Sequence, residues 1–176
     1  QERFYEEWVG FLGAMKPEQV HPVVAEPVRL VRRVVEAVNT QADTSQITVR
    51  VQEGLPKIEA DERMIREAVT NLTLNALDAL GQKGGCIVIG VGYDDEQAVV
   101  FIEVEDDGPG IAPEQLDYIF DPGFTTKEKG NGYGLSIARR IVRAHHGELR
   151  VKSRVGHGTV FRLDLPVNFD IDQQPL

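Results

Sequence analysis

Four polar residues recur along one predicted helix at a spacing that places them on a single face. They lie in the helical stretch 66–80, REAVTNLTLNALDAL, and follow one another at intervals of four, four and three: Glu67, Asn71, Asn75 and Asp78. Residues at these intervals are neighbours on a helix surface, and Asn is a poor choice for a helix interior. Side-chain oxygens in such a stripe can bind a hard cation such as Mg²⁺. A plain solvent-exposed face is the alternative interpretation.

Two glycine-rich segments could bring the backbone close to a ligand. Asp106 follows a predicted strand and opens the first segment, DDGPG over 106–110. A carboxylate there can accept a hydrogen bond from an exocyclic amino group such as that of adenine. The second segment, GNGYGL over 130–135, precedes a predicted helix, whose free N–H groups and dipole favour phosphate. Each motif alone is weak, since a common turn or a flexible hinge would look the same, but together with the Asn stripe they predict a nucleotide site.

The charge of the chain is uneven. The formal net charge is −9, which argues against general nucleic-acid binding. Residues 127–162 nevertheless carry nine Lys or Arg against two Glu, a local charge of +7, so the rest of the chain carries −16. A basic segment in an acidic protein favours a small polyanion as ligand, with an ordinary basic surface as the alternative.

Two classes of protein are excluded by composition. The 176 residues contain no apolar run of the roughly 18 residues that a membrane-spanning helix needs. The lone Cys86 excludes an internal disulfide and a Cys-rich metal site, and we expect it to be buried in a strand within a reducing compartment.

The order of the predicted elements indicates the fold. Apolar periodicity and turn residues predict helices over 28–42, 61–80, 113–118 and 133–145. Alternating apolar residues predict strands over 47–51, 55–60, 86–93, 98–105, 148–155 and 159–165. This order predicts an α/β (α+β) two-layer sandwich, with a mixed, mostly antiparallel sheet and helices on one face. A Rossmann fold is not expected, because strands and helices do not alternate regularly.

The domain boundaries follow from proline content and periodicity. Residues 1–15 place aromatic and apolar residues at helical spacing, and three prolines follow within 16–27. We interpret 1–27 as the end of a dimerisation helix plus a linker, with packing of that helix on the domain itself as the alternative. The domain proper would cover 28–166, and 167–176 would be a loose tail. The chain opens inside a predicted helix without a signal peptide, so we expect a fragment of a longer protein.

Five motifs stand in a characteristic order: NLTLNALDA, DDGPGI, IFDPGFTTK, GNGYGLSIARRIV and GHGTVFRLDLP. They resemble the catalytic, ATP-binding domain of bacterial sensor histidine kinases, which has the Bergerat fold. The resemblance spans about residues 28–166, and the sequences NALDA and FDPGFTTK are most similar to the nitrogen-regulation-like branch. It implies ATP and Mg²⁺ as cofactors.

The resemblance also implies roles for matching residues. Asn75 would coordinate Mg²⁺ and act in catalysis with Lys127, which would approach the phosphates, while Asp106 would read the adenine amino group. The other residues that would contact the nucleotide are Asn71, Asp78, Gly108, Gly110, Ile111, Phe120, Phe124, Thr126, Gly130, Gly132, Tyr133, Gly134, Leu135 and Thr159. Two positions depart from the family pattern, both in or next to the predicted loop over 121–132, the region of the family's ATP lid: Gly123 replaces an aromatic residue, and Tyr133 replaces Leu.

The type of reaction depends on one position. Hydrolysing members of the wider superfamily, and its serine kinases, carry a general-base Glu four residues before the Mg²⁺-binding Asn. Here Asn71 occupies that position, and Glu67 lies one further turn away. An amide cannot take up a proton at neutral pH, whereas a neutral imidazole is already nucleophilic. Histidine phosphotransfer is therefore favoured over a self-contained ATPase or a binding module that has lost transfer.

The phosphoacceptor is expected outside this chain. None of the four histidines is followed by the Glu or Asp typical of acceptor histidines, and His145-His146 at a helix end is predicted to cap the helix or lie on the surface. The resemblance implies two partners, a dimerisation domain of the same protein that carries the acceptor histidine and the receiver domain of a response regulator. It also implies a homodimeric, cytoplasmic parent, with a membrane anchor left open, and a monomeric fragment.

Overall fold

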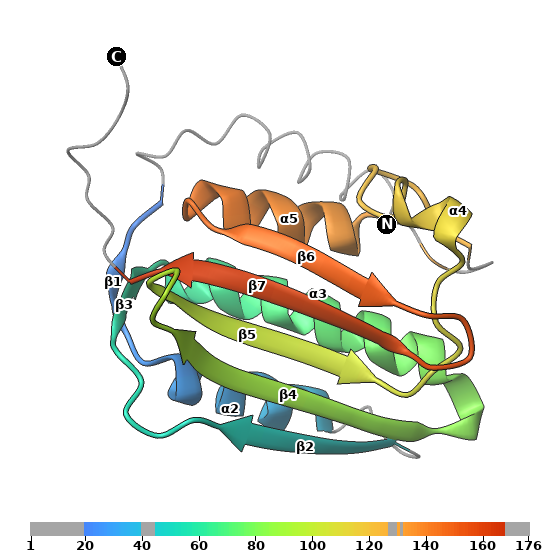
Figure 1. The fold of residues 1–176 in the computed structure, drawn as a ribbon, viewed down its shortest axis with the longest axis horizontal. Coiled ribbons are helices and arrows are strands. Elements are labelled where there is room, and N and C mark those ends of the chain that lie inside the picture. The colour runs from blue at the N-terminus through green and yellow to red at the C-terminus, as the bar shows by residue number, and fades with distance from the viewer. Residues whose placement is uncertain (1–19, 40–44, 127–129, 131, 168–176) are drawn as a thin grey trace.

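The computed structural model describes residues 20–39, 45–126, 130 and 132–167. Helices cover one face of a five-stranded sheet, as Figure 1 shows. The helices are α2 (Pro27–Asn39), α3 (Glu62–Leu80), α4 (Pro113–Leu116) and α5 (Gly134–Ala144). The strands of the sheet are β2 (Ser45–Val51), β4 (Gly85–Asp94), β5 (Val99–Asp106), β6 (Glu148–Ser153) and β7 (Thr159–Pro166).

The sheet is mixed and mostly antiparallel. Its strand order is β2-β4-β5-β7-β6, and of its four pairings only that of β2 with β4 is parallel. The core lies between the sheet and helices α2, α3 and α5, where alternate residues of β4, β5 and β7 are buried. The predicted two-layer sandwich is confirmed.

Helix α3 begins and ends where local signals predict. The Asp61 side chain accepts a hydrogen bond from the N–H of Met64 at 3.2 Å, as an N-cap residue does. Gly81 follows the last helical residue with φ +56° and leads into a short 3₁₀ turn, η2 (Gly81–Lys83). The apolar residues of α3 face the core, so the polar stripe lies at the edge of the contact between α3 and the core.

The region before α2 differs from the predicted linker. Val23–Ala25 forms strand β1, which pairs antiparallel with β3 (Ile58–Ala60) in a separate two-stranded sheet. Val20 and Ala25 are buried with the core, and Pro27 already starts α2. Pro favours the first helical position, and the β-branched residues before it find a partner strand about 35 positions later in the chain. The predicted N-terminal helix over 1–15 lies outside the described residues.

Cys86 is exposed, contrary to the sequence-based expectation. Ile87, Ile89 and Val91 of β4 point towards the helices, so Cys86 points to the uncovered face of the sheet. The strand itself was predicted correctly, but the side of the sheet on which Cys86 lies was not.

His145 caps the end of α5, one of its two predicted placements, but it is buried and does not lie on the surface. Its side chain is buried directly after α5. Nδ1 lies 2.8 Å from the carbonyl oxygen of Ile141, and Nε2 accepts a hydrogen bond from the backbone N–H of Asp61 at 3.0 Å. The ring is therefore the neutral tautomer that carries its proton on Nδ1. It joins the end of α5 to the start of α3.

Acidification is expected to weaken the fold through His145. Burial lowers the pKa of His145, and the hydrogen bond to Ile141 and the charge of Asp61 oppose that shift less strongly. Below the ordinary histidine pKa of about 6.5, the unfolded chain binds a proton that the folded chain resists, so the free energy of unfolding falls as pH falls. We expect urea titrations between pH 8 and 5 to show that the free energy of unfolding of the unsubstituted chain falls with pH, and that it falls less steeply in His145→Gln. The exposed His157→Gln is the control; identical slopes for the parent and His145→Gln would contradict the assignment.

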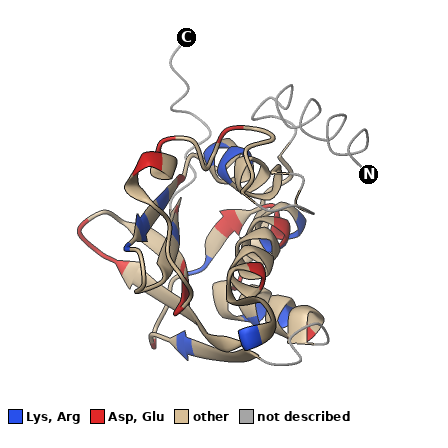
Figure 2. Ribbon diagram, turned by 90° about the vertical axis from the view of Figure 1, so that its right-hand side faces the viewer, with Lys and Arg blue, Asp and Glu red and all other residues tan. Residues whose placement is uncertain are grey.

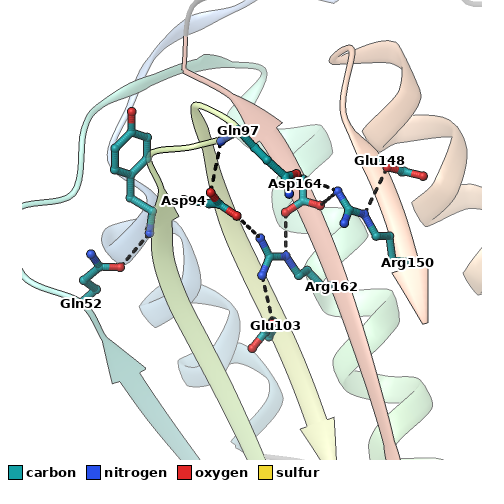
Figure 3. Close-up of polar contacts among 9 residues, drawn as sticks. Gln52, Asp94, Gln97, Glu103, Glu148, Arg150, Arg162 and Asp164 are labelled. Carbon is teal, nitrogen blue, oxygen red and sulfur yellow. Dashed lines mark hydrogen bonds and ion pairs between the residues drawn. The ribbon is translucent and has the colours of Figure 1, made fainter. Parts of the chain in front are cut away.

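A polar network covers part of the face of the sheet that carries no helix (Figure 3). At its centre, the Asp164 side chain is only 4% exposed. Arg162 Nε donates to Asp164 Oδ1 at 2.7 Å, and Arg150 Nη2 lies 2.9 Å from Oδ2. The Arg162 guanidinium also lies 4.1 Å from the centroid of the Phe101 ring. Two arginines thus shield this carboxylate where no helix does.

Removing the central carboxylate is expected to cost more than removing one at the edge. Asp164→Ala leaves two arginines without their shared partner, and we expect a loss of about 2 kcal/mol in the free energy of unfolding. Glu148 pairs with Arg150 at 3.1 Å but is 69% exposed, so Glu148→Ala should cost less than about 1 kcal/mol. Urea denaturation of both variants measures the difference, and equal costs would show that the buried central carboxylate adds no more stability than the exposed one.

Among the described residues, no helix is both long and apolar enough to cross a membrane.

Candidate functional site

Asn71 and Asn75 are half-buried on α3 and form one end of the candidate site. The start of α5 packs against Asn71, because a Cβ placed on Gly134 would lie 3.9 Å from the Cβ and Cγ of Asn71. The amide nitrogen of Asn71 is buried and has no hydrogen-bond partner among the described residues. An unsatisfied buried N–H costs about 1–3 kcal/mol. This donor, next to a helix N-terminus, therefore fits an oxygen of a bound phosphate.

Two carboxylates extend the polar stripe on α3. Glu67 is half-buried, and burial raises the pKa of its carboxyl, opposed by the nearby charge of Arg63. Asp78 is exposed at the other end of the helix. The stripe predicted from spacing therefore runs from a partly desolvated acid to open solvent, with the two Asn side chains between them.

Asp106 forms the other end of the site. It is the last residue of β5 and is buried, and its Oδ1 accepts a hydrogen bond from the N–H of Gly108 at 2.9 Å. The N–H of Thr159 also bonds to this carboxyl. Burial raises the pKa of Asp106, and the neighbouring charge of Asp107 adds to the shift, while these two backbone hydrogen bonds oppose it. A carboxylate held this way can accept from an amino group of a ligand.

The final turn, residues 154–158 between β6 and β7, lies directly against the loop that follows Asp106. A Cβ on Gly158 would collide with the carbonyl oxygen of Asp106, and a Cβ on Gly110 with that of Arg154. The N–H of Gly156 donates to the carbonyl of Pro109 at 2.8 Å. Glycine is therefore needed where the two backbones touch, which explains why both motifs are glycine-rich.

The two positions that depart from the family pattern lie side by side. Gly123 has φ +83°, and a Cβ there would lie 3.6 Å from the hydroxyl oxygen of Tyr133. The N–H of Gly123 donates to the carbonyl of Gly132 at 3.0 Å, and a Cβ on Gly132 would lie 2.5 Å from the carbonyl carbon of Gly123. The Tyr133 side chain thus lies beside the position that lacks an aromatic side chain.

The remaining predicted residues are placed more variably. Phe120 packs edge-on against Phe161 at 6.3 Å between ring centroids, and the guanidinium of Arg139 lies 5.1 Å from the centroid of the Phe120 ring. The ring centroid of Phe124 lies 6.2 Å from that of Tyr118, while Thr126 is exposed. Gly130 is exposed, and Leu135 and Ile111 are half-buried. Lys127 lies outside the described residues.

The described part of the basic segment does not form a single surface. Arg139 lies on an aromatic ring and Arg150 and Arg162 bind Asp164 on the uncovered face of the sheet, away from the Asn stripe. Figure 2 shows Lys and Arg interspersed with Asp and Glu along both the strands and the helices. The local charge of +7 therefore does not by itself locate a polyanion site.

Sequence reasoning missed two residues that hold the loop after Asp106. Asp107 Oδ1 accepts from the N–H of Cys86 at 2.8 Å and ties the loop to the start of β4. Ser153 accepts from the N–H of Ile111 at 2.8 Å and ties it to the end of β6. Neither contact follows from local sequence, because the partners lie 21 and 42 positions away.

The chemistry of the donors bears on the predicted cation. The described residues contain no group of three or more His, Cys, Asp or Glu that could enclose a metal. Mg²⁺ commonly keeps several waters and is held by one or two protein oxygens together with substrate phosphates. The amide oxygen of Asn75 fits that mode, in which the phosphates supply the remaining charge.

Residues 60–168 match the family described as "Histidine kinase-, DNA gyrase B-, and HSP90-like ATPase". The sensor histidine kinase ZraS of Escherichia coli K12 is 39% identical over 159 residues, which cover 89% of this chain and 34% of ZraS. Sporulation kinase E of Bacillus subtilis is 28% identical over 166 residues, 93% of this chain and 22% of that kinase. The chain thus spans about a third or less of these two relatives.

Solved structures show the same fold. Full-length ShkA in complex with AMPPNP matches with a TM-score of 0.79 and 28% identity, over 90% of this chain and 33% of ShkA. The catalytic domain of the histidine kinase ThkA matches with a TM-score of 0.75 and 29% identity, over 84% of this chain and 96% of that domain. With the family match over 60–168, the chain belongs to the histidine kinase-, DNA gyrase B- and HSP90-like ATPases.

Proposed function

We propose that this chain is the ATP-binding catalytic domain of a sensor histidine kinase. It binds Mg-ATP and directs the γ-phosphate to a histidine on a separate dimerisation domain, from which the phosphate passes to an aspartate of a response regulator. The observation that carries this proposal is the buried amide nitrogen of Asn71, on α3 beside the start of α5, which has no hydrogen-bond partner among the described residues. This amide offers a phosphate a donor without supplying a base for water.

Each end of the site has a separate task in this proposal. The Asp106 carboxylate accepts a hydrogen bond from the adenine amino group in the pocket shaped by Gly108 and Gly110. Asn71, the N–H groups at the start of α5 and Lys127 hold the phosphates. Asn75 holds Mg²⁺, which when bound neutralises charge on the phosphates. The chain contributes position and charge rather than proton transfer.

The reaction needs no general base from this chain. A neutral imidazole nitrogen of the acceptor histidine attacks the γ-phosphorus, an N–P bond forms, and the bond from phosphorus to the bridging oxygen breaks as ADP leaves. The proton on the other ring nitrogen then passes to water or to a group outside this chain. Glu67 stands one turn beyond the position from which the hydrolytic relatives activate water, and an amide stands at that position. Transfer to histidine is therefore favoured over hydrolysis.

We propose a domain organisation that the packing before α2 and the greater length of the relatives support. Residues 28–166 form the catalytic domain, 1–27 contain the end of the dimerisation domain and a connection, and 167–176 form a tail. The packing of Val20 and Ala25 indicates that the connection is partly anchored on the catalytic domain. The parent is a cytoplasmic-facing homodimer that acts on a receiver domain, whereas this fragment is a monomer.

Phosphotransfer to a supplied acceptor tests the proposal. The chain is incubated with radiolabelled ATP, Mg²⁺ and the separately expressed dimerisation domain of its parent protein, and label on that domain is measured. Acid-labile, base-stable label is expected, as for a phosphohistidine. A His→Gln variant of the acceptor serves as control. Release of inorganic phosphate without labelling of the acceptor would favour an ATPase instead.

A further inference from the structure

The hydroxyl of Ser153, at the end of β6, stands where the last turn meets the loop after Asp106. Its oxygen lies 2.8 Å from the N–H of Ile111, 2.9 Å from the carbonyl oxygen of Gly158 and 2.8 Å from the hydroxyl oxygen of Thr159. A serine hydroxyl has one proton and two lone pairs. These three contacts therefore use its full hydrogen-bonding capacity.

The directions of the three hydrogen bonds follow from their partners. The Ile111 N–H can only donate and the Gly158 carbonyl can only accept, so Ser153 accepts from the first and gives its single proton to the second. The third contact must then be donated by Thr159. With its proton committed to Ser153, the Thr159 hydroxyl offers only lone pairs to anything else.

Thr159 stands next to the carboxylate that is proposed to read adenine. Asp106 and Thr159 are paired across β5 and β7, both are buried on the helix-facing side of the sheet, and the Thr159 N–H bonds to the Asp106 carboxyl. Asp106 and Thr159 therefore provide two neighbouring acceptors for a base at the proposed adenine site. Adenine carries an amino donor at its 6-position, where guanine carries an acceptor oxygen, so two acceptors favour adenine.

We propose that Ser153 is a positioning residue for base specificity: it orients the Thr159 hydroxyl as an acceptor. This inference rests on the proposed ATP site. It differs from a purely structural role of Ser153, because it predicts an effect that depends on the 6-amino group of the base.

Calorimetric titrations with ATP and with purine riboside triphosphate, which lacks the 6-amino group, separate the two roles. We expect Ser153→Ala to weaken ATP binding about tenfold and binding of the analogue less than about twofold, because only ATP uses the oriented acceptors. Ser153→Thr keeps the hydroxyl and should restore the preference for ATP. Lys152→Ala, at the adjacent exposed position, is the matched control and should bind both ligands as the parent chain does.

Each other outcome has a definite meaning. An equal loss of affinity for both ligands in Ser153→Ala, or no loss, would overturn the inference while leaving the ATP site intact. Failure of the unsubstituted chain to bind ATP would overturn the proposed function itself. If Ser153→Ala does not fold, Thr159→Val tests the same acceptor directly, and a preference for ATP that survives this change would also overturn the inference.

Discussion

Replacing Asn75 by Asp is expected to reduce phosphotransfer from Mg-ATP to a supplied acceptor domain by about a hundredfold or more. The change preserves the size of the side chain at a half-buried position of α3. It adds a negative charge where the triphosphate must lie and replaces a neutral oxygen donor. Loss of one well-placed electrostatic contact in a catalytic site typically costs 10²–10³ in rate. The measurement is the labelling rate of the acceptor domain at saturating Mg²⁺.

The control for Asn75 is a change at the other end of the same helix. Glu62 lies in the first turn of α3 and forms only a loose, partly exposed ion pair with Arg33 at 4.0 Å, so Glu62→Gln should leave transfer unchanged. Urea denaturation should show that both variants remain folded. Normal transfer by Asn75→Asp would show that the proposed metal ligand is wrong.

Replacing Gly158 by Ala is expected to disrupt both the fold around Asp106 and nucleotide binding. The added Cβ would collide with the carbonyl oxygen of Asp106, and the residue has φ +88°. Either the final turn or the loop after Asp106 must move, so we expect a loss of about 3 kcal/mol or more in the free energy of unfolding. ATP affinity should fall below detection by calorimetry, because the displaced loop carries the proposed adenine contacts.

Gly156 provides the matched control in the same turn. It has φ +79°, yet a Cβ there would have no atom within 4 Å. Gly156→Ala therefore carries the backbone strain without the collision and should cost about 1 kcal/mol, with ATP binding retained. If both alanine variants lose similar stability, backbone strain alone explains the effect and the close approach to Asp106 is not important.

Features that depend on local sequence were predicted well. The N-cap Asp61, the end of α3 at Gly81 and the polar stripe on that helix are determined by residues within a few positions of one another. The strands of the sheet were predicted by their alternation, because each has one face against the helices. The ordered motifs then indicated the fold and the family, which the structure and the family match confirm.

Features that depend on distant partners could not be predicted. His145 is a polar residue, and the sequence does not show that the backbone N–H of Asp61, 84 positions away, satisfies its second ring nitrogen in the buried site. β1 is three residues long and becomes a strand only by pairing with β3. The contact between Gly123 and Tyr133, and the role of Ser153, likewise depend on segments that meet only in the folded chain. The roles assigned to the nucleotide-contacting residues stay predictions.

We propose that this chain binds ATP but does not hydrolyse it on its own, and calorimetric titration of the chain with ATP and Mg²⁺ measures both properties in one experiment. We expect saturable heat of binding that stops after each injection, since Asn71 replaces the base needed to activate water. Heat that continues after each injection would mean hydrolysis and would direct attention to Glu67, whose raised pKa makes it the candidate base. No binding heat at all would contradict the assignment of this chain as a catalytic ATP-binding domain.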